Sequence, residues 1–355
     1  MTAHKPAPAA PGPNVPFPPQ EAELVEAIPT GPNIWYEPKW DGFRGVLEND
    51  NGELALWSRN GRPLLRYFPE LRTLGEHLPP HSALDGEIVI EQKGKLEFDL
   101  MQLRLHPAES RIKRLSAETP AMFIAFDVLL WDGDPVHLRP LIERRAFLEK
   151  NVKGVSLSEI TKDPAKATFW LERLEVLGLD GIVAKRTDIP YRPGSREAVK
   201  KVKHNRTVDC VIVGYRTSGK RIATLLLGIY RGDGTLDFVG HTSGIPVQLE
   251  TQLRKLLPPL VEEAGTFARQ FAAVDGRMPG GGSRWSAGRD LPWHEIRPEI
   301  VCEVRFDKFE GSRFRHGTRF ERFRPEKEPL QCTWAQLDVA RRKGDPDLAD
   351  LLRGA

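Results

Sequence analysis

The sequence predicts an α+β protein of two domains, in which antiparallel sheets packed with helices are followed by a small β-barrel. Two observations support this prediction. Up to about residue 205, short apolar segments alternate with turn signals and amphipathic helical segments, and beyond it most segments are closely spaced strands. The chain has 355 residues, which is enough to bury a core in each domain.

We expect a flexible leader over residues 1–20, because this segment contains seven prolines and no apolar core typical of a signal peptide. No apolar run approaches the length of a membrane span, so no membrane partner is expected. The three cysteines lie far apart and form no C-x-x-C motif, which argues against a zinc finger or a disulfide framework. An intracellular, cytoplasmic protein fits these features.

The first domain is expected over residues 21–205. Its segments combine a hairpin with an Asp-Asn-Gly turn, apolar strands and two amphipathic helices, the second of them capped by Asp163 and ending near Gly178. In order, the hairpin covers 45–61, strands 82–90 and 121–133, helices 140–152 and 163–179, and strands 181–187 and 197–204.

The second domain is expected over residues 206–335, before a helical tail at 336–355. Its strands are predicted at 208–216, 223–232, 236–244, 298–309 and 318–324. One helix is predicted at 251–264, and a Gly-rich loop, MPGGGSR, follows it. About five strands with one interposed helix are typical of an OB-type barrel.

Charge is concentrated in two blocks, although the net charge of the chain is only +3. Residues 185–206 contain eight basic and two acidic side chains, a local net of +6, and residues 302–327 contain eight and five, a local net of +3. Such blocks indicate contact with a polyphosphate. Taken alone, however, either block is more often a solvated face.

Lys39 is the candidate for covalent chemistry. A lysine in a half-buried strand is usually a surface residue whose amine reaches solvent. Its amine is a nucleophile only when neutral, and a nearby basic cluster or a bound metal favours that form. Asp41 can orient the lysine, Gly42 lets backbone approach closely, and Arg44 projects from the same region. The local pattern therefore permits a covalent lysine without requiring one.

The segment KWDGFR at 39–44 resembles motif I, K-x-D-G-x-R, of the covalent nucleotidyltransferases, which are ATP-dependent DNA ligases, RNA ligases and mRNA capping enzymes. Further segments resemble motifs Ia, III, IIIa, IV, V and VI of this superfamily in the same order. They are SRNG (58–61), LDGEIV (84–89), FIAFDVL (123–129), DGIVAK (180–185), VKKVK (199–203) and RHGTRFERFRPEK (315–327). The segments EPKWDGFR and RFERFRPEK are most similar to compact bacterial ATP-dependent DNA ligases of the LigC type.

The resemblance implies a role for each matching residue. Lys39 would attack the α-phosphate of ATP and become lysyl-AMP. Glu37 would accept a hydrogen bond from the adenine amino group, and Phe126 would stack on adenine. Arg44 and Arg59 would hold the ribose and the 5′-phosphate end of a nick.

The remaining roles concern phosphate and metal. Glu87 and Asp180 would bind Mg²⁺, or Mn²⁺, with Glu87 also near the ribose. Phosphoryl transfer needs cations around oxygens that gain charge. The resemblance supplies Lys185, Lys201 and Lys203 for the α-phosphate, and Arg322, Arg324 and Lys327 for the departing pyrophosphate.

One residue departs from the pattern, since motif IV usually begins with Glu and here begins with Asp180. The shorter side chain puts the metal distance and the choice between Mg²⁺ and Mn²⁺ in question. Several matched residues also suit plain structural roles: Phe126 fits an apolar core, Lys201 and Lys203 fit a solvated strand edge, and Arg322 fits an exposed strand. Only the order and spacing of the whole set favour the superfamily.

The expected function is that of an ATP-dependent DNA ligase, which seals nicks in double-stranded DNA during repair, recombination or replication. We expect a monomer that is associated with the nucleoid, with repair or polymerase proteins as candidate partners. The DNA would be held by its backbone, without base readout. An RNA ligase or a capping-type guanylyltransferase is the first alternative, because these enzymes share the lysine chemistry. A non-catalytic OB-fold nucleic-acid-binding protein is the second.

Overall fold

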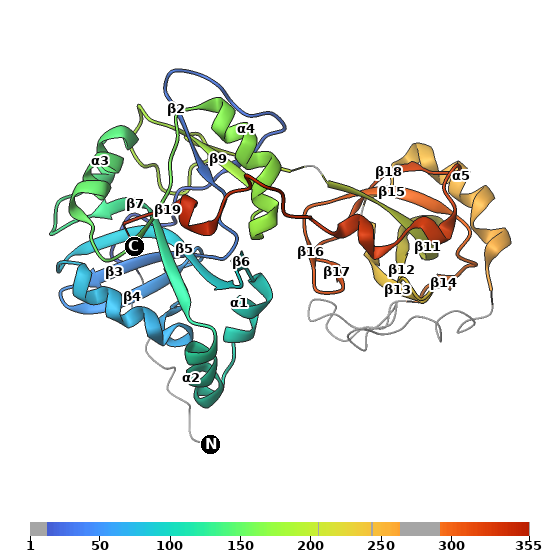
Figure 1. Ribbon diagram of the computed structural model, residues 1–355, viewed down its shortest axis with the longest axis horizontal. Coiled ribbons are helices and arrows are strands. Elements are labelled where there is room, and N and C mark those ends of the chain that lie inside the picture. Colours follow the sequence, from blue (N-terminus) through green and yellow to red (C-terminus); the bar gives the residue numbers. More distant parts are fainter. Residues whose placement is uncertain (1–12, 205, 243, 263–291, 355) are drawn as a thin grey trace. The chain divides into compact units, whose positions relative to one another are not determined.

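The computed structural model describes residues 13–204, 206–242, 244–262 and 292–354. The chain divides into two compact units, one of Met1–Lys203 with Arg341–Ala355 and one of His204–Ala340. The C-terminal residues thus return to the first unit after the second is complete (Figure 1). The predicted Gly-rich loop MPGGGSR lies outside the described residues.

The larger sheet of the first unit has the strand order β19-β8-β7-β5-β3-β4, with β6 added at the end of β5. The hairpin turn that joins β3 to β4 is Asn51-Gly52, and both residues have positive φ, as a two-residue hairpin turn of this type requires. The strands are β3 (Phe43–Asp50), β4 (Glu53–Ser58), β5 (Ser82–Gln92), β6 (Lys95–Leu96), β7 (Ala121–Leu130), β8 (Ser156–Ser158) and β19 (Leu352–Arg353).

A second sheet of the first unit has the order β1-β10-β9-β2. It consists of β1 (Glu23–Leu24), β10 (Val199–Lys203), β9 (Gly181–Arg186) and β2 (Ile34–Pro38). The predicted antiparallel pairing holds for most strands of these two sheets, but β1 pairs parallel with β10 and β7 pairs parallel with β8. The β7–β8 pair is possible because helix α3 (Leu141–Asn151) supplies the crossover that parallel neighbours need.

The two helices that the sequence predicts in the first unit, at 140–152 and 163–179, correspond to α3 and to α4 with the 3₁₀ turn after it, whereas α1 and α2 were not predicted. The carboxylate of Asp163 accepts a hydrogen bond from the Ala165 amide at the start of α4, and Gly178 ends the following 3₁₀ turn with φ of 82°. The described α-helices of this unit are α1 (Phe98–Arg104), α2 (Glu109–Glu118), α3 (Leu141–Asn151) and α4 (Pro164–Arg173).

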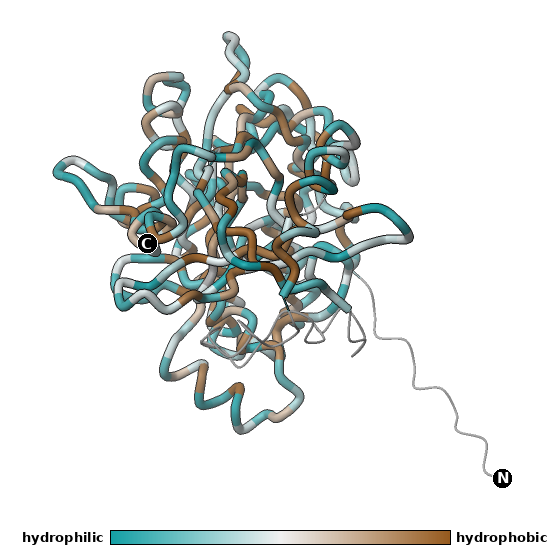
Figure 2. The backbone as a smooth tube through the Cα atoms, turned by 90° about the vertical axis from the view of Figure 1, so that its right-hand side faces the viewer, coloured by the Kyte–Doolittle hydropathy of each residue, from teal (hydrophilic) through white to brown (hydrophobic). Residues whose placement is uncertain are grey.

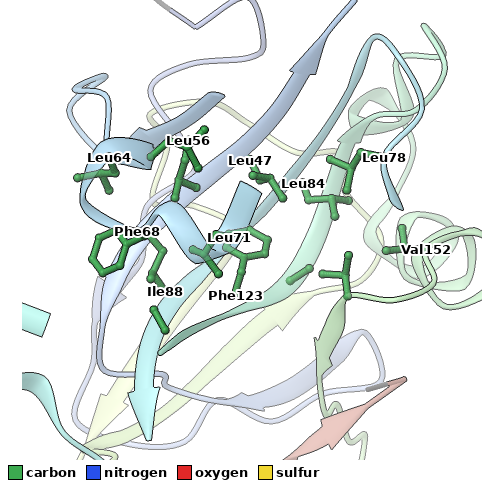
Figure 3. Packing of buried hydrophobic residues seen from close by; sticks show 14 of the residues in the cluster. Leu47, Leu56, Leu64, Phe68, Leu71, Leu78, Leu84, Ile88, Phe123 and Val152 are labelled. Atoms are coloured by element: carbon green, nitrogen blue, oxygen red, sulfur yellow. The ribbon is translucent and has the colours of Figure 1, made fainter. Parts of the chain in front are cut away.

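The core of the first unit lies between the larger sheet and the segment that follows β4. Phe68 and Leu71, from the 3₁₀ turns after β4, point toward Ile88 of β5 and Phe123 of β7 (Figure 3). Phe68 and Ile88 are fully buried. Burial of this apolar surface stabilises the sheet whose β5 and β7 also carry residues of the predicted site.

The second unit contains the sheet β13-β12-β11-β15-β18, with β14 (His294–Glu295) also paired to β11. The predicted β-barrel is not closed among the described residues: one isolated bridge, Thr242–Thr318, joins the ends of the two edge strands. The strands and helix are β11 (Arg206–Ser218), β12 (Arg221–Tyr230), β13 (Leu236–His241), α5 (Val247–Leu256), β15 (Val301–Phe306), β16 (Phe309–Glu310), β17 (Arg313–Phe314) and β18 (Arg319–Phe323).

Two predictions for the ends of the chain need correction. Residues 13–20 are packed on the first unit: Val15 and Gln20 are buried, and the Asn14 side-chain amide donates to Asp50. The tail is not an α-helix, since its described residues form 3₁₀ turns, among them Leu348–Leu351, and then strand β19. Proline content and charge suggested exposed ends, but tertiary partners hold both segments.

Hydrophobic and hydrophilic stretches alternate along the backbone, and several protruding loops are hydrophilic (Figure 2). Among the described residues, no helix is both long and apolar enough to cross a membrane.

Candidate active site

Lys39 lies where the chain crosses from the smaller sheet to the larger one, between β2 and β3. Its backbone amide donates to the Gly181 carbonyl oxygen at 3.0 Å, which fixes the crossing against β9. A Cβ on Gly42 would lie 1.9 Å from the Ile88 carbonyl oxygen, so only glycine fits there. The Lys-x-Asp-Gly spacing therefore brings Lys39 beside two strands that carry other candidate residues.

The Lys39 amine is paired with Asp180, the residue just before β9. The distance from Lys39 Nζ to Asp180 Oδ1 is 2.6 Å, and Lys203 Nζ lies 2.9 Å from Asp180 Oδ2. Burial opposes ionisation of Asp180, but the two ammonium groups hold its pKa at about 2. Burial alone would lower the pKa of Lys39, yet the Asp180 carboxylate raises it. In this arrangement Lys39 is protonated and has to lose Asp180 as its partner before it can act as a nucleophile.

Glu87 of β5 lies on the same side of the crossing. Its Oε1 accepts a hydrogen bond from the Gly42 amide at 3.2 Å. Burial raises the pKa of Glu87 to about 7, although Arg44 and Lys39 act in the opposite direction. The ionised form of such a partly buried carboxyl is stabilised strongly by a nearby cation.

The aromatic ring of Phe126 contacts two cations. The guanidinium carbon of Arg44 and the amine of Lys185 each lie 4.6 Å from the ring centroid, and Phe126 is 9% exposed. Lys185 also pairs with the buried carboxylate of Glu37, with 2.9 Å between Nζ and Oε1. Lys185 thus contacts both predicted adenine partners, Glu37 and Phe126.

Sequence reasoning missed the residues that hold these side chains. Asp85, which is fully buried, accepts two hydrogen bonds from Arg44 at 2.6 and 2.5 Å and one from the Tyr191 hydroxyl at 2.7 Å. Arg144 makes a two-point contact with Asp127, at 2.8 Å for each bond. Asp85 and Asp127 are acidic residues within apolar strands, and that pattern was the available signal.

These side chains line one pocket of the first unit, which has about 200 Å³ of space for water-sized molecules and is partly open to solvent. Seven of the predicted site residues line it: Glu37, Lys39, Arg44, Glu87, Phe126, Lys185 and Lys201. Burial, together with the charges of Lys39 and Lys203, lowers the pKa of Lys201.

Six predicted site residues do not line this pocket. Asp180 and Lys203 adjoin it through Lys39, whereas Arg59 is exposed after β4. The other three, Arg322, Arg324 and Lys327, belong to the second unit.

The three cations of the second unit all pair with acidic side chains. Asp209 lies 2.9 Å from Arg324 Nη1 and 2.6 Å from Lys327 Nζ. Arg322, whose side chain is 64% exposed, pairs with Glu303 at 2.6 Å. Asp209, which holds Arg324 and Lys327, was also missed by sequence reasoning.

The donor set fits a divalent cation that is completed by substrate oxygens. The described residues hold no cluster of three or more His, Cys, Asp or Glu side chains with metal-binding geometry. Mg²⁺ commonly binds one or two carboxylates and takes its remaining ligands from phosphates and water. Glu87 and Asp180 satisfy that requirement, although in this structure the oxygens of Asp180 face lysine amines.

Comparison with known proteins decides the family. Residues 19–203 match the model of the ATP dependent DNA ligase domain, and residues 218–327 match that of the ATP dependent DNA ligase C terminal region. The chain belongs to the ATP-dependent DNA ligase family. Both alternatives from the sequence, an RNA ligase or capping enzyme and a non-catalytic OB-fold protein, are therefore disfavoured.

Two relatives of this ligase align over nearly their full lengths. It is 44% identical to DNA ligase C2 of Mycolicibacterium smegmatis, over 91% of this chain and 94% of the relative. It is 42% identical to DNA ligase C of Mycobacterium tuberculosis, over 96% and 98%. The predicted similarity to compact LigC-type ligases is confirmed.

A solved structure of a Lig E DNA ligase aligns with 86% of this ligase and 98% of its own chain, at a TM-score of 0.51 and 15% identity. At this identity the likeness concerns the fold, a nucleotidyltransferase domain followed by an OB-fold domain.

Proposed function

We propose that this ligase seals nicks in duplex DNA through a covalent adenylate on Lys39. The observation that carries the proposal is the position of the Lys39 amine at the edge of a pocket that also contains an aromatic ring, a buried glutamate and several cations. These are the groups that a nucleoside triphosphate needs at its base and its phosphates.

Three displacements at phosphorus complete the proposed reaction. Neutral Lys39 Nζ forms a bond to the α-phosphorus of ATP, the bond to pyrophosphate breaks, and the amine proton passes to solvent. A 5′-phosphate oxygen of the nick then takes AMP from Lys39. Finally the adjacent 3′-hydroxyl attacks the 5′-phosphorus, loses its proton and expels AMP.

The base site is proposed around Phe126. Adenine stacks on this ring, and Glu37 accepts a hydrogen bond from the adenine amino group. Because Arg44 lies over the ring in this structure, the base takes the place of that cation, and Arg44 moves toward the ribose. Lys185 leaves Glu37 for the α-phosphate, joined there by Lys201.

Glu87 and Asp180 are proposed to hold Mg²⁺ or Mn²⁺. When bound, the metal supplies positive charge to the phosphate oxygens that gain charge during transfer. Its attraction for Asp180 competes with Lys39 for the same oxygens, which favours the neutral amine. Lys203 retains contact with Asp180 or shifts to phosphate. Arg322, Arg324 and Lys327 are proposed to orient the pyrophosphate.

The DNA is proposed to be held by its phosphates, with Arg59 near the 5′-phosphate end and the basic block of residues 185–206 along the backbone. Work in DNA repair, recombination or replication is proposed, since a relative at 31% identity over 83% of this chain is the multifunctional non-homologous end joining DNA repair protein LigD of Mycobacterium tuberculosis. A monomer acting on chromosomal DNA in the cytoplasm, with repair proteins or polymerases as partners, completes the proposal.

The test is sealing of labelled nicked duplexes in which the 3′ and 5′ strands are DNA or RNA in all combinations. Ligation of the all-DNA nick with ATP and Mg²⁺, and transfer of label from ATP but not GTP to the protein, are the expected results. Labelling by GTP, or sealing confined to RNA strands, would favour the RNA ligase or capping alternative. Tight DNA binding with no covalent adduct would favour the non-catalytic one.

A further inference from the structure

The C-terminal strand β19 extends the larger sheet at β8. Leu352 is the register partner of Ser158, and Arg353 is the partner of Leu157. The Glu159 amide donates to the Leu351 carbonyl oxygen at 2.8 Å, and the Leu351 side chain is fully buried. Residues 341–355 are therefore an integral part of the first unit.

Charged contacts attach the same segment at two further points. The Arg353 guanidinium contacts both carboxylate oxygens of Glu159, with 3.0 Å between Nη2 and Oε1. Asp345 accepts two hydrogen bonds from Arg173 of α4, each 2.6 Å long. Asp345 is nearly covered and Arg173 only 16% exposed, so this pair is screened less than most surface pairs.

Ser158 connects this strand to the segment that carries Lys39. Its Oγ accepts a hydrogen bond from the indole nitrogen of Trp40 at 2.9 Å, and both side chains are buried. On the other side of β8, the register with β7 involves Ser156 and Leu157. The register with β7 ends at Leu157, so the backbone of Ser158 is aligned by β19 instead.

We propose that residues 341–355 are a positioning element for Lys39. Strand β19 holds Ser158, Ser158 holds the Trp40 indole, and Trp40 orients the adjacent lysine for attack on ATP. None of the described residues of this segment lines the pocket that contains Lys39. Its loss should therefore slow the attack and leave the binding of ATP unchanged. This inference rests on the proposed role of Lys39 as the nucleophile.

The experiment compares full-length variants in single-turnover transfer of label from ATP to protein, measured across ATP concentrations. Arg353→Glu places a carboxylate against Glu159 and Glu149, and Arg353→Lys preserves the charge. Ser158→Ala removes the acceptor for Trp40 and leaves the backbone pairing of β19 possible. Lys343→Ala, at an exposed position of the same segment, is the matched control.

A small displacement of a reacting group slows a reaction strongly, so we expect Arg353→Glu and Ser158→Ala to lower the maximal rate of label transfer by about 10-fold or more at an unchanged half-saturating ATP concentration. Arg353→Lys should recover most of the rate, and Lys343→Ala should match the wild type. Sealing of a nick that already carries 5′-AMP does not use the Lys39 amine as a nucleophile and should change by less than about 2-fold in the same variants.

Wild-type maximal rates in Arg353→Glu and Ser158→Ala would overturn the inference, as would an increase in half-saturating ATP with no change in maximal rate. If Arg353→Glu unfolds below the assay temperature, Ser158→Ala decides the question alone. A wild-type protein that takes no label from ATP would instead refute the proposed function.

Discussion

The amine of Lys39 and the carboxylate of Asp180 lie 2.6 Å apart, and the second oxygen of Asp180 is held by Lys203. The candidate nucleophile is therefore paired with a candidate metal ligand. We expect metal binding and activation of the lysine to be coupled, because a cation that took the Asp180 oxygens would also free the amine.

Lys39→Ala should abolish the covalent adduct with ATP, since no other lysine of the pocket lies at the crossing between the two sheets. Binding of nicked DNA should change little, because the basic blocks remain. The measurement is label transfer from ATP together with a DNA mobility shift, and Lys153→Ala, at an exposed lysine outside the pocket, is the control. Labelled Lys39→Ala protein would mean that another residue is the nucleophile.

Asp180 should affect both activity and acid stability. Asp180→Ala should reduce nick sealing by at least ~100-fold, and Asp180→Glu should retain much of it, because the longer carboxylate can still bind a metal. Sealing at the wild-type rate by Asp180→Ala across Mg²⁺ concentrations would exclude Asp180 as a ligand.

The acid-stability test uses Asp180→Asn. The folded pKa of Asp180 is about 2, below its unfolded value of roughly 3.9, so its ion pairs stabilise the fold above about pH 4 and lose that effect as the pH falls toward 2. The difference in free energy of unfolding between wild type and Asp180→Asn should narrow over that interval. A constant difference from about pH 6 to pH 2 would contradict the assigned pKa.

Glu87→Gln should stabilise the protein and impair the enzyme. The folded pKa of Glu87 is about 7, above its unfolded value of roughly 4.3, so the wild type loses stability as the pH rises between these values. The neutral amide avoids that loss. We expect the free energy of unfolding to rise by on the order of 1–3 kcal/mol above pH 7 and to stay unchanged below about pH 4. Self-adenylation should fall because a metal ligand is gone.

Denaturant unfolding at several pH values measures the effect of Glu87→Gln, and Glu91→Gln, at an exposed position of the same strand, is the control. Equal free energies of unfolding of the Glu87 variant and the wild type at pH 8 would show that burial does not disfavour the ionised form of Glu87.

Arg322→Ala combined with Arg324→Ala should separate the first step from the last. Pyrophosphate leaves only when Lys39 attacks ATP, so self-adenylation should fall while sealing of a nick that already carries 5′-AMP continues at a reduced rate. The paired assays need a folded variant, which circular dichroism verifies, and Arg319→Ala on the same strand is the control. Equal loss of both activities would assign these arginines to DNA binding.

The cysteine thiols should be unreactive in the native protein. Burial raises the pKa of all three cysteine thiols, that of Cys332 to about 12. Cys210, Cys302 and Cys332 are buried and free. A colourimetric thiol reagent should therefore titrate no cysteine in the native state and three in denaturant. Rapid reaction of one thiol under native conditions would show that the second unit opens around it.

The local sequence determined several elements and indicated the candidate site residues. The Asn51-Gly52 turn, the Asp163 cap and the Gly178 stop depend on backbone preferences of a few adjacent residues, so they could be predicted from short segments. The motif residues were likewise found by order and spacing, because each motif lies on one strand or one turn.

Tertiary structure alone decided how the charges pair and where the ends of the chain lie. Asp85, Asp127 and Asp209 are separated in sequence from their arginine and lysine partners, and no local pattern specifies a pairing between distant strands. For the same reason the C-terminal residues seemed to be a free helical tail. Their strand depends on the exposed edge of β8, and a strand edge is created only when the rest of the sheet has folded.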